Sequence, residues 1–474
     1  MSNNTRGKYL IKNTAIFTLG NLGTKLIHFL LVPLYTNVLN TTDYGVVDLV
    51  ATIGMVLGPV LLLNINEGVM RFALDKGADH SKIMSVGLVA FFFCMAIGLL
   101  IFPAGTLAFH LSDNYAAYIY FYAVSFAGNL LFFGYLRGTE RLLQFSIGNI
   151  INAVLVAGLN ILFLVVFQMG IAGYFAAYTL SNLICCIYAF CVGRVWRVIR
   201  NFCIDKVLTK DMLKYSVVLI PNTFMWWIIN SSDRIMITAF LGSSANGIFA
   251  VSSKIPTLLS TLVTIFNTAW SYSAIKENES KDKDAYANSV YNGMVMLALV
   301  IGALMIFVMK PFLSIYVSAD YYTAWRYTPY LVVGFVFLSL ASFLGTYYTV
   351  NKDSKGFLFS SVIAAVCNLA LNYFLIPWLG IAGGAIATAI SYIIVFIYRA
   401  IDTRKYIRIT VFSSKQGISS GLLMIMGGAM FAPIIISYVL MSICLIAILW
   451  IYKDTWMMYL ATIRKQIKQK MHKK

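Results

Sequence analysis

A lysine lies near the middle of the first long apolar stretch of this chain, and other polar side chains share its helix face. They are Thr14, Thr18, Asn21, Lys25 and His28. Their spacing of three or four residues places them on one stripe of a helix over about residues 11–39. That stretch is long and apolar enough to cross a membrane. Because an ionisable group at membrane depth is costly, we expect Lys25 to face a protein interior or a water-filled cavity.

Polar faces recur on three further apolar stretches. Residues 44–67 carry Asp48 and Thr52; residues 214–241 carry Asn222, Trp226, Asn230 and Asp233, with Arg234 beside them; residues 247–272 carry Lys254, Thr257, Thr261, Thr264 and Thr268. We predict a polar cavity lined by side chains that include Asn21, His28, Asn230, Thr257 and Thr261. Three cations against two carboxylates in these spans favour an anionic ligand.

Purely structural roles also remain open for the same residues. Asp233 can neutralise Lys254 or Lys25 as a structural bridge between helices. Lys254 can extend along its helix to reach the membrane surface. His28 can be a hydrogen-bonded polar residue without a role in proton transfer. Glu67 and Arg71, four residues apart, are predicted to form a surface pair.

The composition indicates an all-α integral membrane protein. Of 474 residues, 60% are hydrophobic and 11% charged, and the mean hydropathy is +0.80; soluble domains carry about 25% charged residues. Continuous apolar runs argue against a transmembrane β-barrel. We expect no signal peptide, because the first run lacks a cleavage site.

About fourteen spans are predicted, at residues 11–39, 44–67, 83–109, 116–136, 143–167, 172–193, 214–241, 247–272, 287–309, 328–350, 357–377, 381–399, 416–435 and 436–452.

The net charge of +18 follows the predicted topology. Of 36 Lys and Arg residues, only Lys310 and Arg326 fall in predicted external segments. This distribution obeys the positive-inside rule and places both termini in the cytoplasm. The charge therefore does not indicate a nucleic-acid partner, whereas the basic tail is suited to anionic lipid headgroups.

Residues that would indicate catalysis or a metal site are missing from the pattern. The seven cysteines are scattered and form no C-x-x-C motif, so we expect neither a metal nor a redox role. There is no phosphate-binding glycine loop and no Ser/His/Asp arrangement. We expect a protein that is not an enzyme and has no resident cofactor.

An internal repeat organises the chain. The segment Gly170-Ile-Ala-Gly-Tyr-Phe-Ala-Ala-Tyr resembles Gly380-Ile-Ala-Gly-Gly-Ala-Ile-Ala-Thr, and the helix before each carries Leu-Asn, at Leu159-Asn160 and Leu371-Asn372. Leu39 to Val47 likewise resembles Leu241 to Phe249. Six spans used twice give two parallel lobes related by an axis along the membrane normal. We predict a first lobe at residues 1–200, a second at 201–408, two added helices at 409–452 and a basic cytoplasmic tail at 453–474.

Prolines lie on the four spans that carry the charges, at Pro33, Pro59, Pro221 and Pro256. Each removes a backbone hydrogen bond and can bend its helix. They are interpreted either as bending points for alternating access or as ordinary prolines tolerated in membrane helices.

The chain resembles a family of polysaccharide exporters. The resemblance lies in Pro33-Leu-Tyr-Thr-Asn-Val-Leu, Asp43-Tyr-Gly and Glu67-Gly-Val-Met-Arg-Phe, and in Asp233-Arg234, Leu241-Gly and the run from Gly247 to Lys254. These segments are similar to Wzx-type O-unit flippases of the multidrug/oligosaccharidyl-lipid/polysaccharide (MOP) exporter superfamily.

The resemblance implies a MATE-like fold in a bacterial inner membrane, moving an undecaprenyl-diphosphate-linked oligosaccharide between leaflets. It implies diphosphate binding by Lys25, Arg234 and Lys254, and tuning or coupling to H⁺ or Na⁺ by Asp48 and Asp233. Polysaccharide polymerase and assembly proteins are the expected partners, and the two added helices are suited to the lipid tail. The alternatives are a cation-coupled multidrug antiporter, a MurJ-type lipid II flippase and a membrane scaffold subunit.

Overall fold

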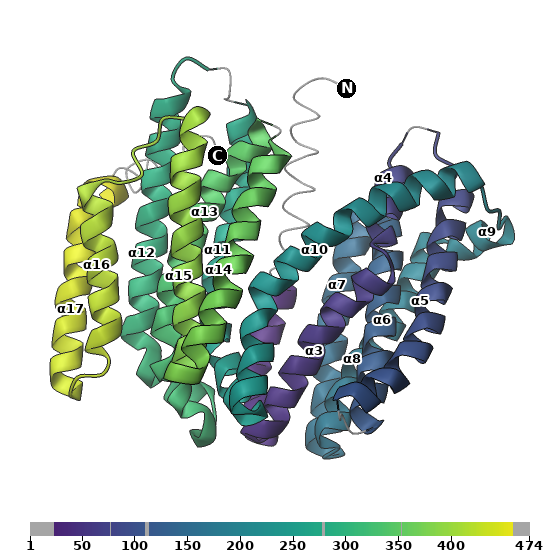
Figure 1. Cartoon of the computed structure of the whole chain (residues 1–474), viewed down its shortest axis with the longest axis horizontal. Helices are drawn as coiled ribbons and strands as arrows, with labels where there is room; N and C mark the ends of the chain where they lie inside the picture. The colour runs from purple at the N-terminus through teal and green to yellow at the C-terminus, as the bar shows by residue number, and fades with distance from the viewer. Residues whose placement is uncertain (1–22, 76, 110–112, 277–279, 352, 458–474) are drawn as a thin grey trace, which may run out of the picture. The chain divides into compact units, whose positions relative to one another are not determined.

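The secondary structure of the described chain is helical. The computed structural model describes residues 23–75, 77–109, 113–276, 280–351 and 353–457, and Figure 1 shows its helices. Twelve described helices are long and apolar enough to cross a membrane. The predicted all-α membrane fold is therefore confirmed, whereas the predicted number of fourteen spans is not.

Two predicted spans, at residues 11–39 and 416–435, are not among these twelve helices, for different reasons. Thr14, Thr18 and Asn21 lie outside the described residues, and the helix is described from Gly23 onward. The helix predicted at residues 416–435 is α16, and it has only 16 residues. It ends before Ala432 and Pro433, where the sequence indicates the turn that leads into α17.

The described chain divides into two compact units. One comprises Met1–Ser231 and Gly242–Gly247, and the other comprises Ser232–Leu241 and Ile248–Lys474. The helices of the first are α2 (Val32–Val38), α3 (Thr41–Leu61), α4 (Ile65–Ala73), α5 (His80–Phe109), α6 (Asp113–Gly138), α7 (Leu142–Asn160), the π-helix η1 (Ile161–Val166), α8 (Gly170–Gly193), α9 (Val195–Arg200) and most of α10 (Lys206–Leu241).

The second unit holds the end of α10 and the helices that follow. They are α11 (Ser243–Lys276, from Ile248 onward), α12 (Lys283–Tyr316), η2 (Ala319–Arg326), α13 (Thr328–Val350), α14 (Ser354–Leu379), α15 (Ile381–Asp402), η3 (Thr403–Lys405), α16 (Ser414–Ala429) and α17 (Ile434–Ile451).

The packing order repeats within each unit, as the sequence repeat predicts. In the first unit α8 packs against both α6 and α7. In the second unit α15 packs in the same way against α13 and α14. The helices that begin with Gly-Ile-Ala-Gly, α8 and α15, therefore hold corresponding positions in their units.

Two glycines at corresponding repeat positions bring the first turns of α3 and α11 into backbone contact. A Cβ on Gly45 would overlap the carbonyl oxygen of Ser243, and a Cβ on Gly247 would overlap that of Thr41. Asn246 also donates to the Gly45 carbonyl over 2.8 Å. Small residues allow such close approach between membrane helices, so this crossing depends on both glycines.

The second predicted span is interrupted, which corrects its expected extent of 44–67. Pro59 lies two residues before the end of α3, and the chain turns through Leu63 and Asn64, whose φ angles are 53° and 52°. The Asn64 side chain donates to Thr223 of α10 over 3.0 Å. Helix α4 then begins at Ile65 in a new direction.

The predicted pair between Glu67 and Arg71 is wrong. Glu67 instead accepts from Arg137 of α6 at 3.1 Å, and Arg71 pairs with the exposed Asp75 at 2.6 Å. Because α4 packs against α6, the Glu67 carboxylate faces that helix, whereas Arg71 follows the outer face one turn later.

Candidate functional site

The last third of α10 carries a buried carboxyl that is hydrogen-bonded to a neighbouring helix. Asp233 is 6% exposed, and its Oδ2 accepts a hydrogen bond from the Thr388 hydroxyl of α15 over 2.8 Å. Thr388 in turn lies 3.5 Å from the Asn368 amide nitrogen of α14. The carboxyl is thus bonded directly to α15 and linked through Thr388 to α14, all within the second unit.

The amides of α14 extend this network. Asn372 donates to the side-chain oxygen of Asn368, one helical turn before it, over 3.0 Å. Ser232 donates to the same Asn368 oxygen over 2.5 Å. The Asn372 side-chain oxygen has no hydrogen-bond partner among the described residues. We call Ser232, Asp233, Asn368, Asn372 and Thr388 the Asp233 cluster.

The chemistry of the Asp233 cluster suits a small hard cation. It gathers a carboxylate, amide oxygens and hydroxyl oxygens, which are the ligands that such cations prefer. Burial makes an isolated carboxylate costly, so a bound cation or a proton would stabilise it. The unpartnered Asn372 oxygen supplies a further acceptor at the same place.

Two of the predicted cations lie on α10 and α11. Arg234 directly follows Asp233 on α10, and Lys254 lies on α11. The Arg234 guanidinium donates to the Ser253 hydroxyl over 3.2 Å, which places it beside the first part of α11. Both Arg234 and Lys254 are partly buried. The structure therefore places the Arg234 side chain beside the turn of α11 that contains Lys254.

The threonine face of α11 is satisfied largely within its own helix. Thr257 donates to the Lys254 carbonyl over 2.5 Å and Thr261 to the Thr257 carbonyl over 2.9 Å. Thr257 is exposed and Thr261 is buried. Side chains of Asn222, Trp226, Asn230 and Thr268 lie outside the described part of the chain, as does Asn21.

The first unit has its own buried polar cluster, built from aromatic hydroxyls. Asp48 of α3 is 7% exposed and interacts electrostatically with Tyr178 of α8. The Tyr178 hydroxyl lies 3.2 Å from His28 Nδ1 and 3.5 Å from the Tyr35 hydroxyl, and its ring packs 4.6 Å from Tyr174. His28 thus has a hydrogen-bond partner, which agrees with its interpretation as a hydrogen-bonded polar residue.

Lys25 lies one turn before His28, and its side chain is exposed. It is not buried in the first unit, in contrast to Asp48. The cations and carboxyls from the sequence therefore fall into two groups, with Lys25, His28 and Asp48 in one unit and Asp233, Arg234, Lys254, Thr257 and Thr261 in the other.

The central hydroxyls of the two clusters occupy equivalent repeat positions. Tyr178 lies eight residues after Gly170, and Thr388 lies eight residues after Gly380. Tyr178, Thr388 and Asn372 were predicted only as members of the repeat, and none of them, nor Asn368, was predicted as a site residue. The signal that marks them is the repeat itself, because each hydroxyl ends the matching segment of its half.

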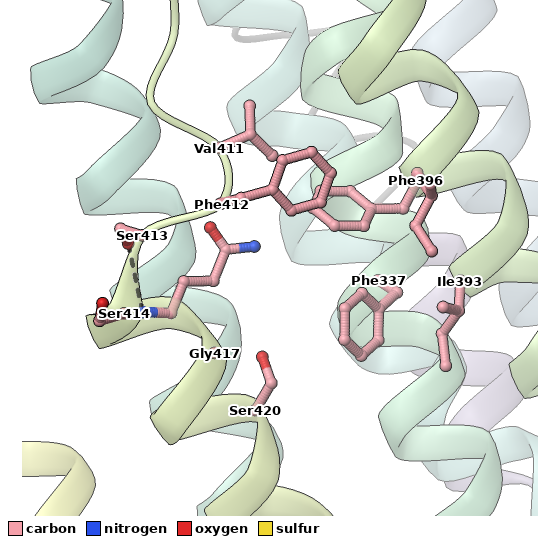
Figure 2. Close-up of a pocket in the computed structure, with 11 residues that line it drawn as sticks. Phe337, Ile393, Phe396, Val411, Phe412, Ser413, Ser414, Gly417 and Ser420 are labelled. Atoms are coloured by element: carbon pink, nitrogen blue, oxygen red, sulfur yellow. Dashed lines mark hydrogen bonds between the residues drawn. The ribbon is translucent and has the colours of Figure 1, made fainter.

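An open apolar pocket separates α16 from α13 and α15 in the second unit. Its volume is about 340 Å³, and Figure 2 shows the side chains that line it, among them Phe337, Phe396 and Phe412. Ser413, also on its wall, caps α16 by accepting from the Gln416 backbone over 3.2 Å. The pocket is therefore apolar on the side of α13 and α15 and polar at the start of α16.

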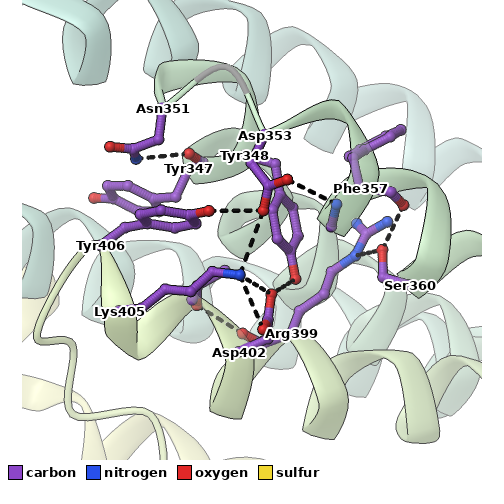
Figure 3. Close-up of polar contacts among 12 residues, drawn as sticks. Tyr347, Tyr348, Asn351, Asp353, Phe357, Ser360, Arg399, Asp402, Lys405 and Tyr406 are labelled. Carbon is purple, nitrogen blue, oxygen red and sulfur yellow. Dashed lines mark hydrogen bonds and ion pairs between the residues drawn. The ribbon is translucent and has the colours of Figure 1, made fainter.

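A polar network joins the loop before α14 to the end of α15 (Figure 3). Lys405 pairs with Asp353 at 3.3 Å and with Asp402 at 3.1 Å. Tyr406 donates to Asp353 over 2.7 Å and Tyr348 to Asp402 over 2.8 Å. The Tyr406 hydrogen bond, followed by the Gly356 amide, lowers the pKa of the Asp353 carboxyl below its ordinary value.

A buried arginine that the sequence did not single out lies beside this network. Arg399 is 4% exposed, and it donates to Ser360 over 3.1 Å and to the Ala341 carbonyl over 3.0 Å. Its guanidinium lies 5.0 Å from the Phe357 ring centre. Arg399 lies in the last turn of α15. In the sequence it therefore looks like the cations that usually flank the ends of membrane helices.

Comparisons with known proteins agree with this architecture. One similar solved structure is an inward-facing multidrug resistance MATE family transporter of the MOP superfamily. It is 14% identical in sequence, with a TM-score of 0.62, and the match covers 80% of this chain and 97% of the transporter chain. The lipid II flippase MurJ, in an inward closed conformation, is 16% identical with a TM-score of 0.62, covering 93% of this chain and 99% of its own. These similarities show that this chain shares the fold of these two solved structures.

One curated relative and one family also match. An uncharacterized membrane protein of Methanocaldococcus jannaschii is 21% identical over 418 residues, covering 82% of this chain and 96% of the relative. The family described as polysaccharide biosynthesis protein matches residues 10–272, more than half of the chain. With its helices arranged as in MOP-superfamily structures, this chain belongs to that polysaccharide biosynthesis protein family.

Proposed function

We propose that this protein is a flippase that moves a polyprenyl-diphosphate-linked oligosaccharide from the inner to the outer leaflet of a bacterial cytoplasmic membrane. The observation that carries the proposal is the family match across residues 10–272, the part of the chain that contains Lys25, Arg234 and Lys254. A sugar headgroup cannot cross hydrocarbon unaided, because its polar groups would lose their hydrogen bonds to water. A membrane protein of polysaccharide biosynthesis with this fold would surround the headgroup with polar side chains while it crosses.

The three cations are proposed to bind the diphosphate. Lysine and arginine are the usual partners of phosphate oxygens, and an arginine can bind two of them at once. Arg234 is already oriented by the hydrogen bond to Ser253. Lys25 is exposed and therefore free to meet a ligand from its own unit.

The Asp233 cluster is proposed to hold the coupling ion, Na⁺ or H⁺. Its support is the buried Asp233 carboxyl together with the amide and hydroxyl oxygens described above. Binding a cation there neutralises the carboxyl, so the free energy of the second unit depends on occupancy. Asp48, beside Tyr178, is the corresponding proposal for the first unit.

The apolar pocket beside α16 is proposed to accept part of the lipid tail. Three phenylalanines and two isoleucines contribute to its lining, which suits an isoprenoid chain. The serines at the start of α16 face the same pocket and suit the polar end of a lipid. In this proposal the added helices α16 and α17 serve the lipid and the two units serve the headgroup.

Lipid analysis of a deletion strain tests the proposal. The expected result is an undecaprenyl-diphosphate-linked oligosaccharide that accumulates on the inner leaflet and is cleared by the wild-type gene but not by Lys25→Ala. The matched control is Lys281→Ala, which removes an exposed lysine outside the predicted spans and should behave as wild type.

Other results would assign a different activity. Accumulated lipid II, with normal lipid-linked oligosaccharides, would indicate a lipid II flippase. Normal levels of both lipids, with altered resistance to cationic drugs, would contradict the proposal in favour of a multidrug antiporter. Restoration of polysaccharide without any transport would indicate a scaffold subunit that serves the polymerase.

A further inference from the structure

The segment that joins the two halves carries a surface that the proposed function does not use. Between the candidate spans Gly170–Gly193 and Lys206–Ile229, the chain forms the short helix α9 and six further residues. Both ends of this segment adjoin membrane helices. Because α9 has only six residues, about 9 Å at 1.5 Å per residue, the segment must stay close to the membrane surface.

One face of α9 is buried and fixes the orientation of the helix. Val195 is fully buried and Val198 is 9% exposed, and both belong to the apolar core of the first unit. The following residues are held as well, since the Cys203 amide donates to Ser85 over 3.2 Å and Asp205 pairs with Lys82 at 3.1 Å. The segment is therefore a built surface whose outward side chains are set by its own packing.

The outward side combines large apolar side chains with cations. Trp196 is 46% exposed, Phe202 is 49% exposed and Ile204 is 53% exposed, although they lie outside the candidate spans. The interleaved cations are Arg194, Arg197, Arg200 and Lys206, all exposed. Exposed Trp and Phe among Arg and Lys are typical of segments that lie in the membrane interface.

The arginines of this segment have no carboxylate partner in the described part of the chain. None of Arg194, Arg197 and Arg200 makes an ion pair among the described residues. Asp205, the nearest carboxylate in sequence, is engaged by Lys82 and by the backbone amides of Val207 and Leu208. The surface therefore keeps its positive charge for an external partner.

We propose that residues 194–206 form a binding surface for anionic phospholipid headgroups of the inner leaflet. The positive-inside rule places this basic segment on the cytoplasmic side, where anionic lipids attract basic residues near the membrane surface. The apolar side chains insert beside the headgroups while the arginines contact the phosphates. An acidic soluble protein fits less well, because it would leave Trp196, Phe202 and Ile204 in water.

Tryptophan quenching by brominated lipids tests this proposal on the full chain. The protein is reconstituted in phosphatidylcholine vesicles that contain a minor fraction of brominated phosphatidylglycerol or, separately, brominated phosphatidylcholine. The signal of Trp196 is taken as the difference between the wild type and Trp196→Phe. We expect the anionic lipid to quench Trp196 several-fold more than the neutral lipid, and added salt to reduce the difference.

The charge variants give the decisive comparison. Replacing Arg194, Arg197 and Arg200 with Gln should lower the lipid preference by roughly tenfold or more. The matched control replaces Lys281, Lys355 and Lys415, three exposed cations elsewhere, and should keep the preference. If the triple arginine variant does not fold, Arg197→Gln alone and the salt titration of the wild type make the same test.

Two results would overturn the proposal. Equal quenching by the two lipids would show that the surface does not select anionic headgroups. Quenching of Trp196 by water-soluble iodide but by neither lipid would show that the surface faces water and suits a soluble partner. Neither result bears on whether the protein is a flippase, so the two proposals fail separately.

Discussion

At the scale of single residues, the buried carboxyl of Asp233 depends on a donor from another helix. That donor is the Thr388 hydroxyl at 2.8 Å, and the Gly384 carbonyl at 3.0 Å competes with Asp233 for the same proton. A buried polar group that loses its partner costs far more than an exposed one. The cluster is thus both a candidate ion site and a structural constraint on α10, α14 and α15.

Thr388→Val is predicted to destabilise the second unit. The substitution keeps the shape of the side chain and removes the hydroxyl, so the free energy of unfolding should fall by about 1–3 kcal/mol. Thr388→Ser, which keeps a hydroxyl, should recover most of the loss. Thermal unfolding of the purified variants with and without Na⁺ measures the effect, and a Val variant as stable as wild type would contradict it.

The residues of this cluster also show the limit of sequence reasoning. Asp233 and Arg234 were found because charges in an apolar span are conspicuous. Asn368, Asn372 and Thr388 were not, because neutral polar residues are common in membrane helices and their spacing does not reveal which helix they face. The contact of Glu67 with Arg137 was missed for a related reason, since a partner four residues away was the only one visible in the sequence.

At the scale of elements, helix contacts in this fold depend on local backbone features. The helix breaks near Leu31 and Leu63 lie next to Pro33 and Pro59, so two of the four prolines mark real interruptions. Helix boundaries elsewhere follow the apolar runs closely. Pro59 indicates a bend, but the sequence pattern does not reveal that the chain turns through Leu63 and Asn64 with positive φ angles.

Alanine at Gly45 or Gly247 is predicted to be strongly destabilising. Each new Cβ would overlap a backbone carbonyl of the facing helix, and backbone cannot move aside as a side chain can. Overpacking of this kind costs about 1–3 kcal/mol and occasionally more. Gly421→Ala, where the Cβ meets nothing within 4 Å, is the matched control in thermal unfolding. Equal stability of all three variants would show that the helices do not touch at this crossing.

Tyr406→Phe is predicted to change the acid stability of the loop network. The Tyr406 hydrogen bond is the first cause of the lowered pKa of Asp353, whose ordinary value is 3.8. Because the folded pKa lies below the unfolded one, the stabilisation is present above the unfolded pKa and is lost as pH falls through the folded pKa. The variant should therefore unfold at higher pH during acidification, measured as melting temperature against pH. Tyr373→Phe is the control, and superimposable profiles for wild type and Tyr406→Phe would refute the prediction.

At the scale of the whole molecule, the repeat accounts for the architecture. Two units with the same helix packing order follow from the duplication, and the fold matches MOP-superfamily structures. Periodicity and hydropathy were sufficient for that result. The assignment of Gly242–Gly247 to the first unit was not predictable, because it arises from the close crossing with α3.

Thiol labelling tests the predicted topology. Cys203 is exposed in the segment between the two halves, which the positive-inside rule places in the cytoplasm. In a variant that keeps only this cysteine, a membrane-impermeant maleimide should react in inside-out vesicles and not in intact cells. Ala319→Cys, placed in the predicted external segment of a cysteine-free chain, should show the opposite pattern. Labelling of Cys203 from outside intact cells would invert the topology.

The most direct test of the central claim is translocation by the purified protein. Proteoliposomes that contain a fluorescent polyprenyl-diphosphate oligosaccharide are assayed for the fraction of substrate reached by an added glycosidase, with a Na⁺ or H⁺ gradient imposed. We predict that the protein equilibrates the substrate between leaflets, that one of the two gradients accelerates the process, and that Asp233→Asn removes the acceleration. Translocation no faster than in protein-free liposomes under either gradient, from a protein that is folded in the membrane, would contradict the account.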